Sequence, residues 1–413
     1  MDSIHICGGY PLCGETRIQG SKNAVLPVLA ATVLVDGIST LYNCPKIADV
    51  QCMIKLLEST GCHVTWKGDT IAVDARHISS TALPGEYVTR MRSSVILMGA
   101  LLGREGQVSI SYPGGCVIGK RPIDMHLEAF ARMGVELTEA GGVLTARART
   151  LTGGYIPLAF PSVGATENVI LAAALAGGET VICGGAQEPE IAALCEFLIR
   201  AGADICRDGM GTLVIHGAPG LHAVTYRIPP DRIVAGTYLL GCMAAGGRIF
   251  LRGADSSQLG AALTVIRQMG GNCTCCQDGI GLAMEGRPAA VACLKTAVYP
   301  GFPTDLQSQL LAALTVAKGE SIIEETVFEN RFRVVPELMK MGAQIKAEGN
   351  RVRICGVEQL HGADVTAQEL RGGAALCMAA LAAHGDSRIC NRHFIDRGYA
   401  SLEADIRSLG GRI

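Results

Sequence analysis

The sequence has few aromatic residues, little charge and no long apolar run. Aromatic residues make up 4% of the 413 residues, with a single Trp, and charged residues make up 18%. No stretch reaches the roughly 18 uninterrupted apolar residues of a membrane span. The start, Met1-Asp2-Ser3, lacks the basic residues of a secretory signal. We therefore expect a cytoplasmic protein that does not enter a membrane.

The chain also lacks an excess of charge of either sign. It has 36 Lys and Arg against 38 Asp and Glu, a net charge of −2, and no long run of one sign. A protein that binds nucleic acid or an anionic membrane surface needs a basic face. We therefore expect small-molecule partners and neither nucleic acid nor membrane.

Cysteine is plentiful, but its spacing does not indicate a metal site or a disulfide framework. The 17 cysteines are odd in number and scattered through apolar runs, which favours reduced thiols that pack as small hydrophobic groups. The one close cluster, Cys273-Thr274-Cys275-Cys276, has no second CxxC and no His pair at zinc-site spacing.

The strongest feature that is present is an internal repeat. Six helix-like segments each end at a glycine that is followed by a strand-like segment, and these glycines recur at a nearly constant interval. They are Gly61, Gly134, Gly202, Gly270, Gly342 and Gly410. A second set follows Ala-rich helices with the same period, at Gly37, Gly106, Gly178, Gly247, Gly319 and Gly385. Two independent markers with one period predict six similar units.

The Ala-rich segments predict buried helices, because a helix without a polar face must be covered on all sides. Six units divide into two groups of three at Ile228-Pro229-Pro230-Asp231, where two prolines interrupt any helix or strand. We expect two domains, residues 22–229 and residues 1–21 plus 230–413, with the active site in the cleft between them.

Polar residues occupy equivalent places at the starts of the predicted buried helices. They include Lys22, Arg92, Asp231, Arg232, Asp305 and Arg371. A helix start attracts anions, so Lys or Arg there opposes the helix dipole, and a bound anion would explain it. The alternative is local capping, for which Thr304 with Gln307 and Thr366 with Glu369 have the spacing of capping boxes.

One glycine-rich loop, Pro113–Pro122, carries a candidate reactive cysteine. Its segment from Gly114 to Lys120 matches GxxxxGK, but Arg121 stands where a P-loop has Ser or Thr, so we reject a P-loop. Cys116 remains, on a glycine loop beside Lys120 and Arg121. Nearby cations lower a thiol pKa and favour the reactive thiolate.

Long motifs along the whole chain resemble the UDP-N-acetylglucosamine 1-carboxyvinyltransferase family of enolpyruvyl transferases. They include GSKNAVLPVLAATVL from Gly20, RMRSSVILMGALL from Arg90, PGGCVIGKRPIDMHLEAF from Pro113, PSVGATENVILAAALAGGETVI from Pro161, PGFPTDLQSQLLAAL from Pro300 and FIDRGY from Phe394. The resemblance implies a pair of inside-out α/β barrels, in which six βαβαββ repeats surround buried helices.

The resemblance also implies an activity and its partners. The family transfers the enolpyruvyl group of phosphoenolpyruvate to the 3′-hydroxyl of UDP-N-acetylglucosamine through a tetrahedral intermediate. It thereby starts peptidoglycan synthesis, needs no metal or organic cofactor and is the target of fosfomycin. We expect the same of this chain.

The site residues follow from the resemblance, position by position. Catalytic roles fall on Cys116, Asp305, Lys22 and Arg397: Cys116 protonates the methylene carbon, and Asp305 contacts or deprotonates the sugar hydroxyl. Phosphoenolpyruvate is bound by Lys22, Asn23, Arg121, Arg371 and Arg397, whose cations suit its phosphate and carboxylate. The nucleotide sugar is bound by Arg92, Arg121, Pro122, Ile123, Asp124, Met125, Ser162, Val163, Gly164, Asp305, Val327 and Arg331.

Three alternatives compete with this expectation. The related shikimate enzyme uses the same fold and the same donor, but it does not need the loop cysteine. A non-catalytic nucleotide-sugar sensor would not need Lys22, Cys116, Asp305 and Arg397 together. A P-loop phosphotransferase is disfavoured by Arg121. The chain departs from some relatives in having Phe160-Pro161 where they carry Lys, which affects one expected contact to the uridine diphosphate.

Overall fold

The structure is a computed structural model that describes every residue except 1, 115–118 and 120–121. The described chain divides into two compact units. The inserted unit comprises residues 20–114 and 122–229, and the split unit comprises residues 2–19, 119 and 230–413. The chain passes from one unit to the other at residues 19–20 and at 229–230, and residue 119 is assigned to the split unit although residues 114 and 122 belong to the inserted unit.

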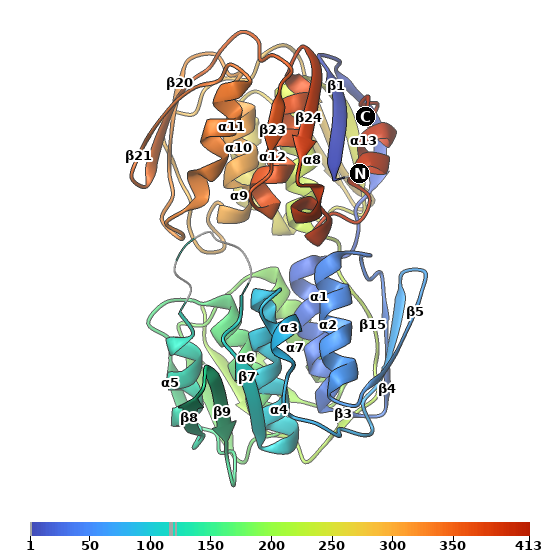
Figure 1. The fold of residues 1–413 in the computed structure, drawn as a ribbon, viewed down its shortest axis with the longest axis vertical. Coiled ribbons are helices and arrows are strands. Elements are labelled where there is room, and N and C mark those ends of the chain that lie inside the picture. The colour runs from blue at the N-terminus through green and yellow to red at the C-terminus, as the bar shows by residue number, and fades with distance from the viewer. Residues whose placement is uncertain (1, 115–118, 120–121) are drawn as a thin grey trace. The chain divides into compact units, whose positions relative to one another are not determined.

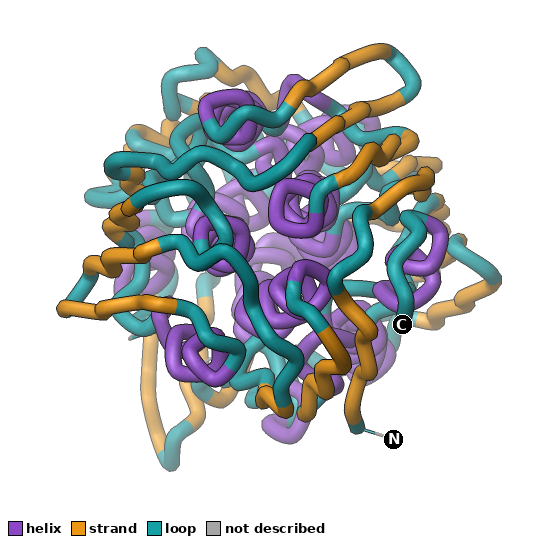
Figure 2. Tube along the Cα trace, turned by 90° about the horizontal axis from the view of Figure 1, so that it is seen from above, coloured by secondary structure: helices purple, strands orange, loops and turns teal. Residues whose placement is uncertain are grey.

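Each unit has three buried helices, as the Ala-rich segments predict. They are α1 (Lys22–Ala31), α4 (Leu97–Glu105) and α6 (Val163–Ala173) in the inserted unit, and α8 (Arg232–Ala245), α10 (Gln307–Leu314) and α12 (Leu370–Ala382) in the split unit. In α12, every residue from Leu370 to Leu381 is buried. In both units the strands lie outside these helices (Figures 1 and 2). This is the expected inside-out arrangement.

Each repeat has a second helix, which is amphipathic or half-buried. These helices are α2 (Ala48–Ser59), α5 (Asp124–Arg132), α7 (Pro189–Arg200), α9 (Gly260–Gln268), α11 (Val335–Lys340) and α13 (Leu402–Ser408). The short helical segments are α3 (Gly85–Val88), η1 (Thr32–Leu34), η2 (Arg92–Ile96), η3 (Ser256–Gln258), η4 (Thr304–Leu306), η5 (Arg331–Val334) and η6 (Arg392–Arg397).

The sheets of the inserted unit repeat one topology. Their strand orders are β15 (Thr225–Arg227)-β4 (Ile38–Tyr42)-β6 (Thr70–Asp74)-β5 (His63–Lys67), then β7 (Gln107–Ser111)-β9 (Val143–Arg147)-β8 (Glu136–Ala140), and β10 (Tyr155–Pro157)-β11 (Glu179–Cys183)-β13 (Leu213–His216)-β12 (Asp204–Arg207). A short pair joins β14 (Leu221–His222) to β3 (Val35–Asp36). In the four-stranded sheets, the first strand pairs in parallel and the other two pairings are antiparallel.

The split unit repeats the same topology. Its sheets are β17 (Asn272–Cys276)-β18 (Gly279–Met284)-β16 (Gly247–Arg252)-β2 (Leu12–Arg17), then β19 (Leu294–Lys295)-β20 (Glu320–Glu324)-β22 (Arg351–Cys355)-β21 (Gln344–Glu348), and β1 (Ser3–Gly8)-β24 (Gly385–Cys390)-β23 (Asp364–Thr366). Strand β2 pairs in parallel with β16, although the whole inserted unit lies between these two strands in the sequence. Strand β2 therefore completes a sheet whose other strands come after the inserted unit.

The two sets of marker glycines explain the repeat. All twelve have a positive φ, between 69° at Gly106 and 154° at Gly37, which residues with a side chain rarely adopt. Each glycine of the Ala-rich set leads directly into a strand, as predicted. The prediction of a strand after Gly410 is wrong: the chain there forms only an isolated bridge between Arg412 and Cys7 of β1.

The cysteines only partly match the expected small hydrophobic role. Cys44, Cys195 and Cys377 are buried, and burial raises their pKa to about 12, 11 and 12. Six others are exposed, namely Cys13, Cys206, Cys275, Cys276, Cys293 and Cys355. The described cysteines are all free thiols, and the position of Cys116 lies outside the described residues.

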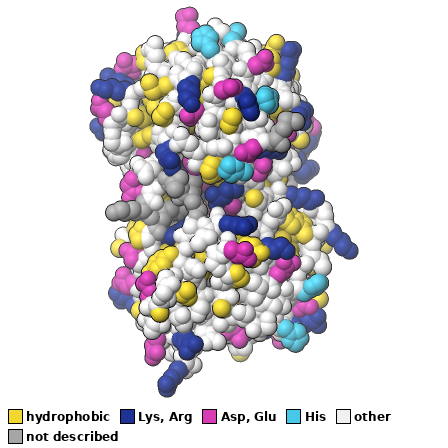
Figure 3. Space-filling model, viewed as in Figure 1, with side chains coloured by type: hydrophobic (Ala, Val, Ile, Leu, Met, Phe, Trp, Pro, Cys, Tyr) yellow, Lys and Arg dark blue, Asp and Glu magenta, His cyan; other side chains and the backbone are white. Residues whose placement is uncertain are grey.

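The surface agrees with the balanced composition. Acidic and basic side chains are both scattered among uncharged ones on the visible face of each unit (Figure 3). Among the described residues, no helix is both long and apolar enough to cross a membrane.

Candidate functional site

Lys22 is the first residue of α1 and lies in an ion pair. Its Nζ is 2.9 Å from Oδ2 of Asp49, which lies in the first turn of α2, and both side chains are largely buried. Ser21 caps α1 by accepting a hydrogen bond from the N–H of Ala24. The cation at this helix start therefore has a protein partner, and its position alone does not require a bound anion.

Three further predicted segments lie in the inserted unit. Arg92 begins η2, which leads into α4, and its Nη2 donates to the carbonyl oxygen of Pro122 at 2.9 Å. Ser162 caps α6 by accepting from the N–H of Ala165. The segment η2 packs against both α1 and α6, so Arg92 begins an element that contacts two of the buried helices.

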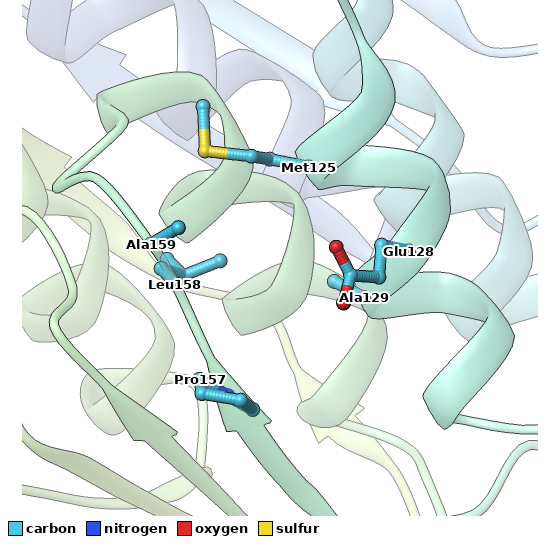
Figure 4. Close-up of a pocket in the computed structure, with 6 residues that line it drawn as sticks. All are labelled: Met125, Glu128, Ala129, Pro157, Leu158 and Ala159. Atoms are coloured by element: carbon cyan, nitrogen blue, oxygen red, sulfur yellow. The ribbon is translucent and has the colours of Figure 1, made fainter.

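A groove runs between α5 and the chain from the last residue of β10 to Ala159 (Figure 4). Met125, Glu128 and Ala129 of α5 form one side, and Pro157, Leu158 and Ala159 form the other. The Met125 side chain extends across toward Leu158 and Ala159. Exposed Phe160 follows directly, before the cap of α6. The groove offers a mainly apolar slot next to a helix start.

Asp305 forms the centre of a charged cluster in the split unit. Its Oδ1 accepts from Nη2 of Arg331 at 2.6 Å, and its Oδ2 accepts from Nη2 of Arg371 at 2.8 Å. Both arginine side chains are at most 4% exposed, whereas that of Asp305 is 25% exposed. The carboxylate is thus held from behind by two buried cations, with part of its surface open.

Acidic residues behind this cluster fix its backbone. Glu369 is the N-cap of α12, and its carboxylate accepts from the N–H groups of Arg371 and Gly372. Its Oε2 also lies 3.7 Å from Nη1 of Arg331. Glu325 accepts from the Thr304 hydroxyl at 2.9 Å, and that hydroxyl in turn accepts from Nε of Arg331.

Both predicted capping boxes are wrong. Glu369 itself, not Thr366, caps α12, and Thr304 uses its hydroxyl on Glu325 instead of capping the helix. At α12 the backbone N–H groups bind the Glu369 carboxylate, which is a stronger acceptor than a hydroxyl. At Thr304 the hydroxyl oxygen already accepts a hydrogen bond from Nε of Arg331.

Arg371 retains hydrogen-bonding capacity. Its Nη1 is buried and has no hydrogen-bond partner among the described residues. Although burial works against the charge, attraction to Asp305, and less to Asp231, raises the pKa of Arg371. A permanently charged guanidinium with an unused, buried N–H group is suited to bind a carboxylate or phosphate oxygen.

The predicted residues therefore form two groups. Lys22, Asn23, Arg92, Pro122, Ile123, Asp124, Met125, Ser162, Val163 and Gly164 lie in the inserted unit, and Asp305, Val327, Arg331, Arg371 and Arg397 lie in the split unit. Within the second group, Val327 donates its N–H to Glu325, and Arg397 ends η6, which packs on α12. Cys116 and Arg121 lie outside the described residues, as does most of the rejected GxxxxGK segment.

Sequence reasoning missed the partners of these residues. Asp49, Glu325 and the pair His126 and Asn168 were not assigned a role, although all are buried polar residues. For Asp49 and Asn168 the signal that could have identified them is an Asp or Asn inside an apolar helix pattern, because such a residue needs a partner when it is buried.

The family model described as EPSP synthase (3-phosphoshikimate 1-carboxyvinyltransferase) matches residues 6–406. Curated relatives are similar over the full chain. A protein of Caldanaerobacter subterraneus named UDP-N-acetylglucosamine 1-carboxyvinyltransferase 2 is 45% identical, covering 100% of this chain and 99% of its own. A Zymomonas mobilis protein named UDP-N-acetylglucosamine 1-carboxyvinyltransferase is 43% identical, with the same coverage.

Solved structures share the fold. The enolpyruvyl transferase NikO from Streptomyces tendae superposes with a TM-score of 0.90 at 27% identity, covering 98% of this chain and 97% of its own. EPSP synthase from Acinetobacter baumannii superposes with a TM-score of 0.76 at 16% identity, covering 99% and 98%. The second likeness shows the fold alone.

Proposed function

The chain belongs to the EPSP synthase family of enolpyruvyl transferases, and from this premise we propose that it transfers the enolpyruvyl group of phosphoenolpyruvate to the 3′-hydroxyl of UDP-N-acetylglucosamine, with release of phosphate. The reaction would be the first committed step of peptidoglycan synthesis, carried out in the cytoplasm. The acceptor is inferred from the names of relatives that are 45% and 43% identical over the full chain.

The observation that carries the proposal is the Asp305 cluster. A half-open carboxylate held by two buried arginines, one of which has an unused Nη1, combines a proton acceptor with an anion-binding group. Each carboxylate oxygen keeps a second lone pair, so Asp305 can accept a hydrogen bond from a sugar hydroxyl while it stays paired with both arginines.

The donor has two anionic groups and needs several cations. We assign phosphoenolpyruvate to Lys22, Asn23, Arg121, Arg371 and Arg397. Arginine binds carboxylate and phosphate oxygens with paired N–H groups, which gives orientation as well as affinity. When the donor binds, Lys22 would exchange part of its interaction with Asp49 for the new anion.

The nucleotide sugar is assigned to the groove and its surroundings. The residues are Arg92, Arg121 to Met125, Ser162 to Gly164, Asp305, Val327 and Arg331. The apolar slot between Met125 and Leu158 suits a flat uracil ring, and Phe160 follows its last lining residue, Ala159, in the sequence. The start of α6 suits a phosphate. Phe160 would then contribute ring stacking where some relatives use a Lys.

The chemistry requires an acid and a base. The 3′-hydroxyl oxygen bonds to C2 of phosphoenolpyruvate as Asp305 accepts the hydroxyl proton and Cys116 protonates C3. Positive charge develops at C2 during this addition. In the second step the bond from C2 to the phosphate oxygen breaks, phosphate leaves, and loss of a proton from C3 restores the double bond. Arginines stabilise the departing anion.

A phosphate-release assay with two acceptors tests the proposal. We expect phosphate only when phosphoenolpyruvate and UDP-N-acetylglucosamine are both present. The Arg371→Lys variant, which lacks the planar guanidinium, should raise KM for phosphoenolpyruvate about tenfold or more, equivalent to about 1.4 kcal/mol. The matched control is Arg252→Lys, because Arg252 forms an exposed ion pair with Glu15 in the same unit.

A second candidate comes from the description of the matching family model, which is transfer to 3-phosphoshikimate. Phosphate release with shikimate 3-phosphate, and none with the nucleotide sugar, would replace our proposal with that reaction. A nucleotide-sugar sensor would bind the sugar but release no phosphate with either acceptor.

A further inference from the structure

The orientation of the Asn168 amide in α6 is fixed by two backbone groups. Its Oδ1 accepts from the N–H of Gly99 at 2.7 Å, and its Nδ2 donates to the carbonyl oxygen of Val95 at 3.1 Å. Backbone donors and acceptors cannot exchange roles, so a flipped amide would lose both bonds. Gly99 allows this contact, because a Cβ there would collide with the backbone of Asn168.

The second N–H of this amide determines the state of His126. Nδ1 of His126, in α5, lies 2.7 Å from Nδ2 of Asn168. Because Nδ2 can only donate, Nδ1 must accept through a lone pair and cannot carry a proton. A neutral imidazole then has its proton on Nε2. The ring is 4% exposed and Asn168 is fully buried, so water does not easily replace this contact.

The Nε2 edge of His126 faces the start of α6. A Cβ built on Gly164 would lie 3.1 Å from Cε1 and 3.5 Å from Nε2 of His126. Gly164 belongs to the segment from Ser162 to Gly164 that we assign to the nucleotide sugar. The glycine is needed there because a larger residue would press on the imidazole edge.

We propose that Asn168 is a positioning residue that holds His126 neutral with its proton on Nε2, so that a fixed N–H donor lies beside the nucleotide-sugar segment at the start of α6. The identity of the ligand rests on the proposed function. The protonation state of His126 does not depend on it. A free imidazole gains a charge near pH 6.5. Holding it neutral keeps the charge of this helix start, and hence the affinity for an anionic ligand, constant around neutral pH.

Charged and titratable groups lie on the elements packed around His126. They are Asp124, Glu128 and Arg132 on α5, Arg92 on η2, Glu167 on α6, Glu136 and Glu139 on β8, and Tyr155 on β10. None of these groups changes the assignment at Nδ1, because the donor that lies against Nδ1 is the amide of Asn168.

Nitrogen NMR of the full chain, labelled with 15N-histidine, tests the state of His126 without any ligand. Its signal is assigned by its loss in the His126→Gln variant. We expect the neutral form with a proton on Nε2 throughout pH 6 to 8. Titration of His126 in this range, or a proton on Nδ1, would overturn the inference whatever the enzyme does.

The Asn168→Asp variant tests the functional consequence. A carboxylate at the same place would draw a proton onto Nδ1 and charge the ring, so KM for UDP-N-acetylglucosamine should change about tenfold between pH 6 and 8. In the unchanged chain it should vary by less than about twofold, and KM for phosphoenolpyruvate should not distinguish the two chains. Equal pH profiles for the nucleotide sugar would refute the positioning role. If NMR shows the expected state of His126 but the chain has no turnover, only the proposed function is refuted.

Discussion

Lys22 and Asp49 join the first turns of α1 and α2 through an ion pair of 2.9 Å, most of which is out of contact with water. Removing one member leaves the other charge buried without this partner. We expect Asp49→Ala to lower the free energy of unfolding by about 3 kcal/mol, measured by urea denaturation. Asp49→Asn, which keeps an acceptor, should cost less.

The matched control for Asp49→Ala is Glu58→Ala, because Glu58 pairs with Lys55 on the same helix α2 but in water. An exposed pair of this kind contributes about 0.5 kcal/mol. Equal losses in the two variants would show that burial of the Lys22 pair is not important for stability.

Asp305 should be essential for turnover. The Asp305→Asn variant keeps the size of the side chain and loses the base, so kcat should fall by about 10²- to 10⁴-fold, with a much smaller change in KM for the donor. Steady-state phosphate release measures both constants. Asp255→Asn serves as control, since Asp255 caps the exposed segment η3 of the same unit. A kcat within fivefold of the unchanged chain, on the order of 1 kcal/mol, would exclude the role of base.

Glu167 makes stability depend on pH. Burial, together with the nearby carboxylates of Glu190 and Glu188, raises the pKa of Glu167 well above its ordinary value. The folded chain then binds a proton that the unfolded chain has lost, so this group makes the fold less stable as pH rises from its unfolded pKa toward its folded pKa. The slope is at most about 1.4 kcal/mol per pH unit.

Glu167→Gln should remove this loss, since Gln resembles the protonated carboxyl. We expect the variant to be more stable than the unchanged chain at pH 8 and closer to it at pH 5, by urea denaturation at both values. Glu196→Gln on the exposed face of α7 is the control. A stability difference that does not depend on pH would mean that Glu167 is not protonated in the folded state.

Cys116 should react with fosfomycin when the nucleotide sugar is present. Lys120 and Arg121 are close in sequence and favour its thiolate. Peptide mass analysis should find one adduct on Cys116 and none on Cys275, which is exposed and accepts only a weak contact from Arg267. An unmodified Cys116 peptide would count against the proposed chemistry, and the Cys116→Asp variant should resist the compound.

The sequence predicted the elements that depend on local pattern. Ala-rich stretches became buried helices, and each glycine of the Ala-rich set leads into a strand. It did not predict the contacts between residues that are far apart in the sequence. Neither Asp49 as the partner of Lys22 nor Asn168 as the partner of His126 follows from spacing, because their contact arises only when helices from different segments pack together.

Partners at long range also explain the errors at the site. Glu369 caps its own helix while it lies close to Arg331, and Thr304 is oriented by Glu325 from another strand end. A local spacing rule assigns such residues to the nearest backbone, whereas the folded chain offers a charged partner that binds more strongly.

The pairing of β2 with β16 determines the order in which the chain can fold during synthesis. Residues 20–229 can form their sheets as soon as they leave the ribosome, since β15 completes the sheet of β4 from within that stretch. Strands β1 and β2 must wait without their partner strands until β24 and β16 have been made. The earliest segment to be translated is thus among the last to find its place.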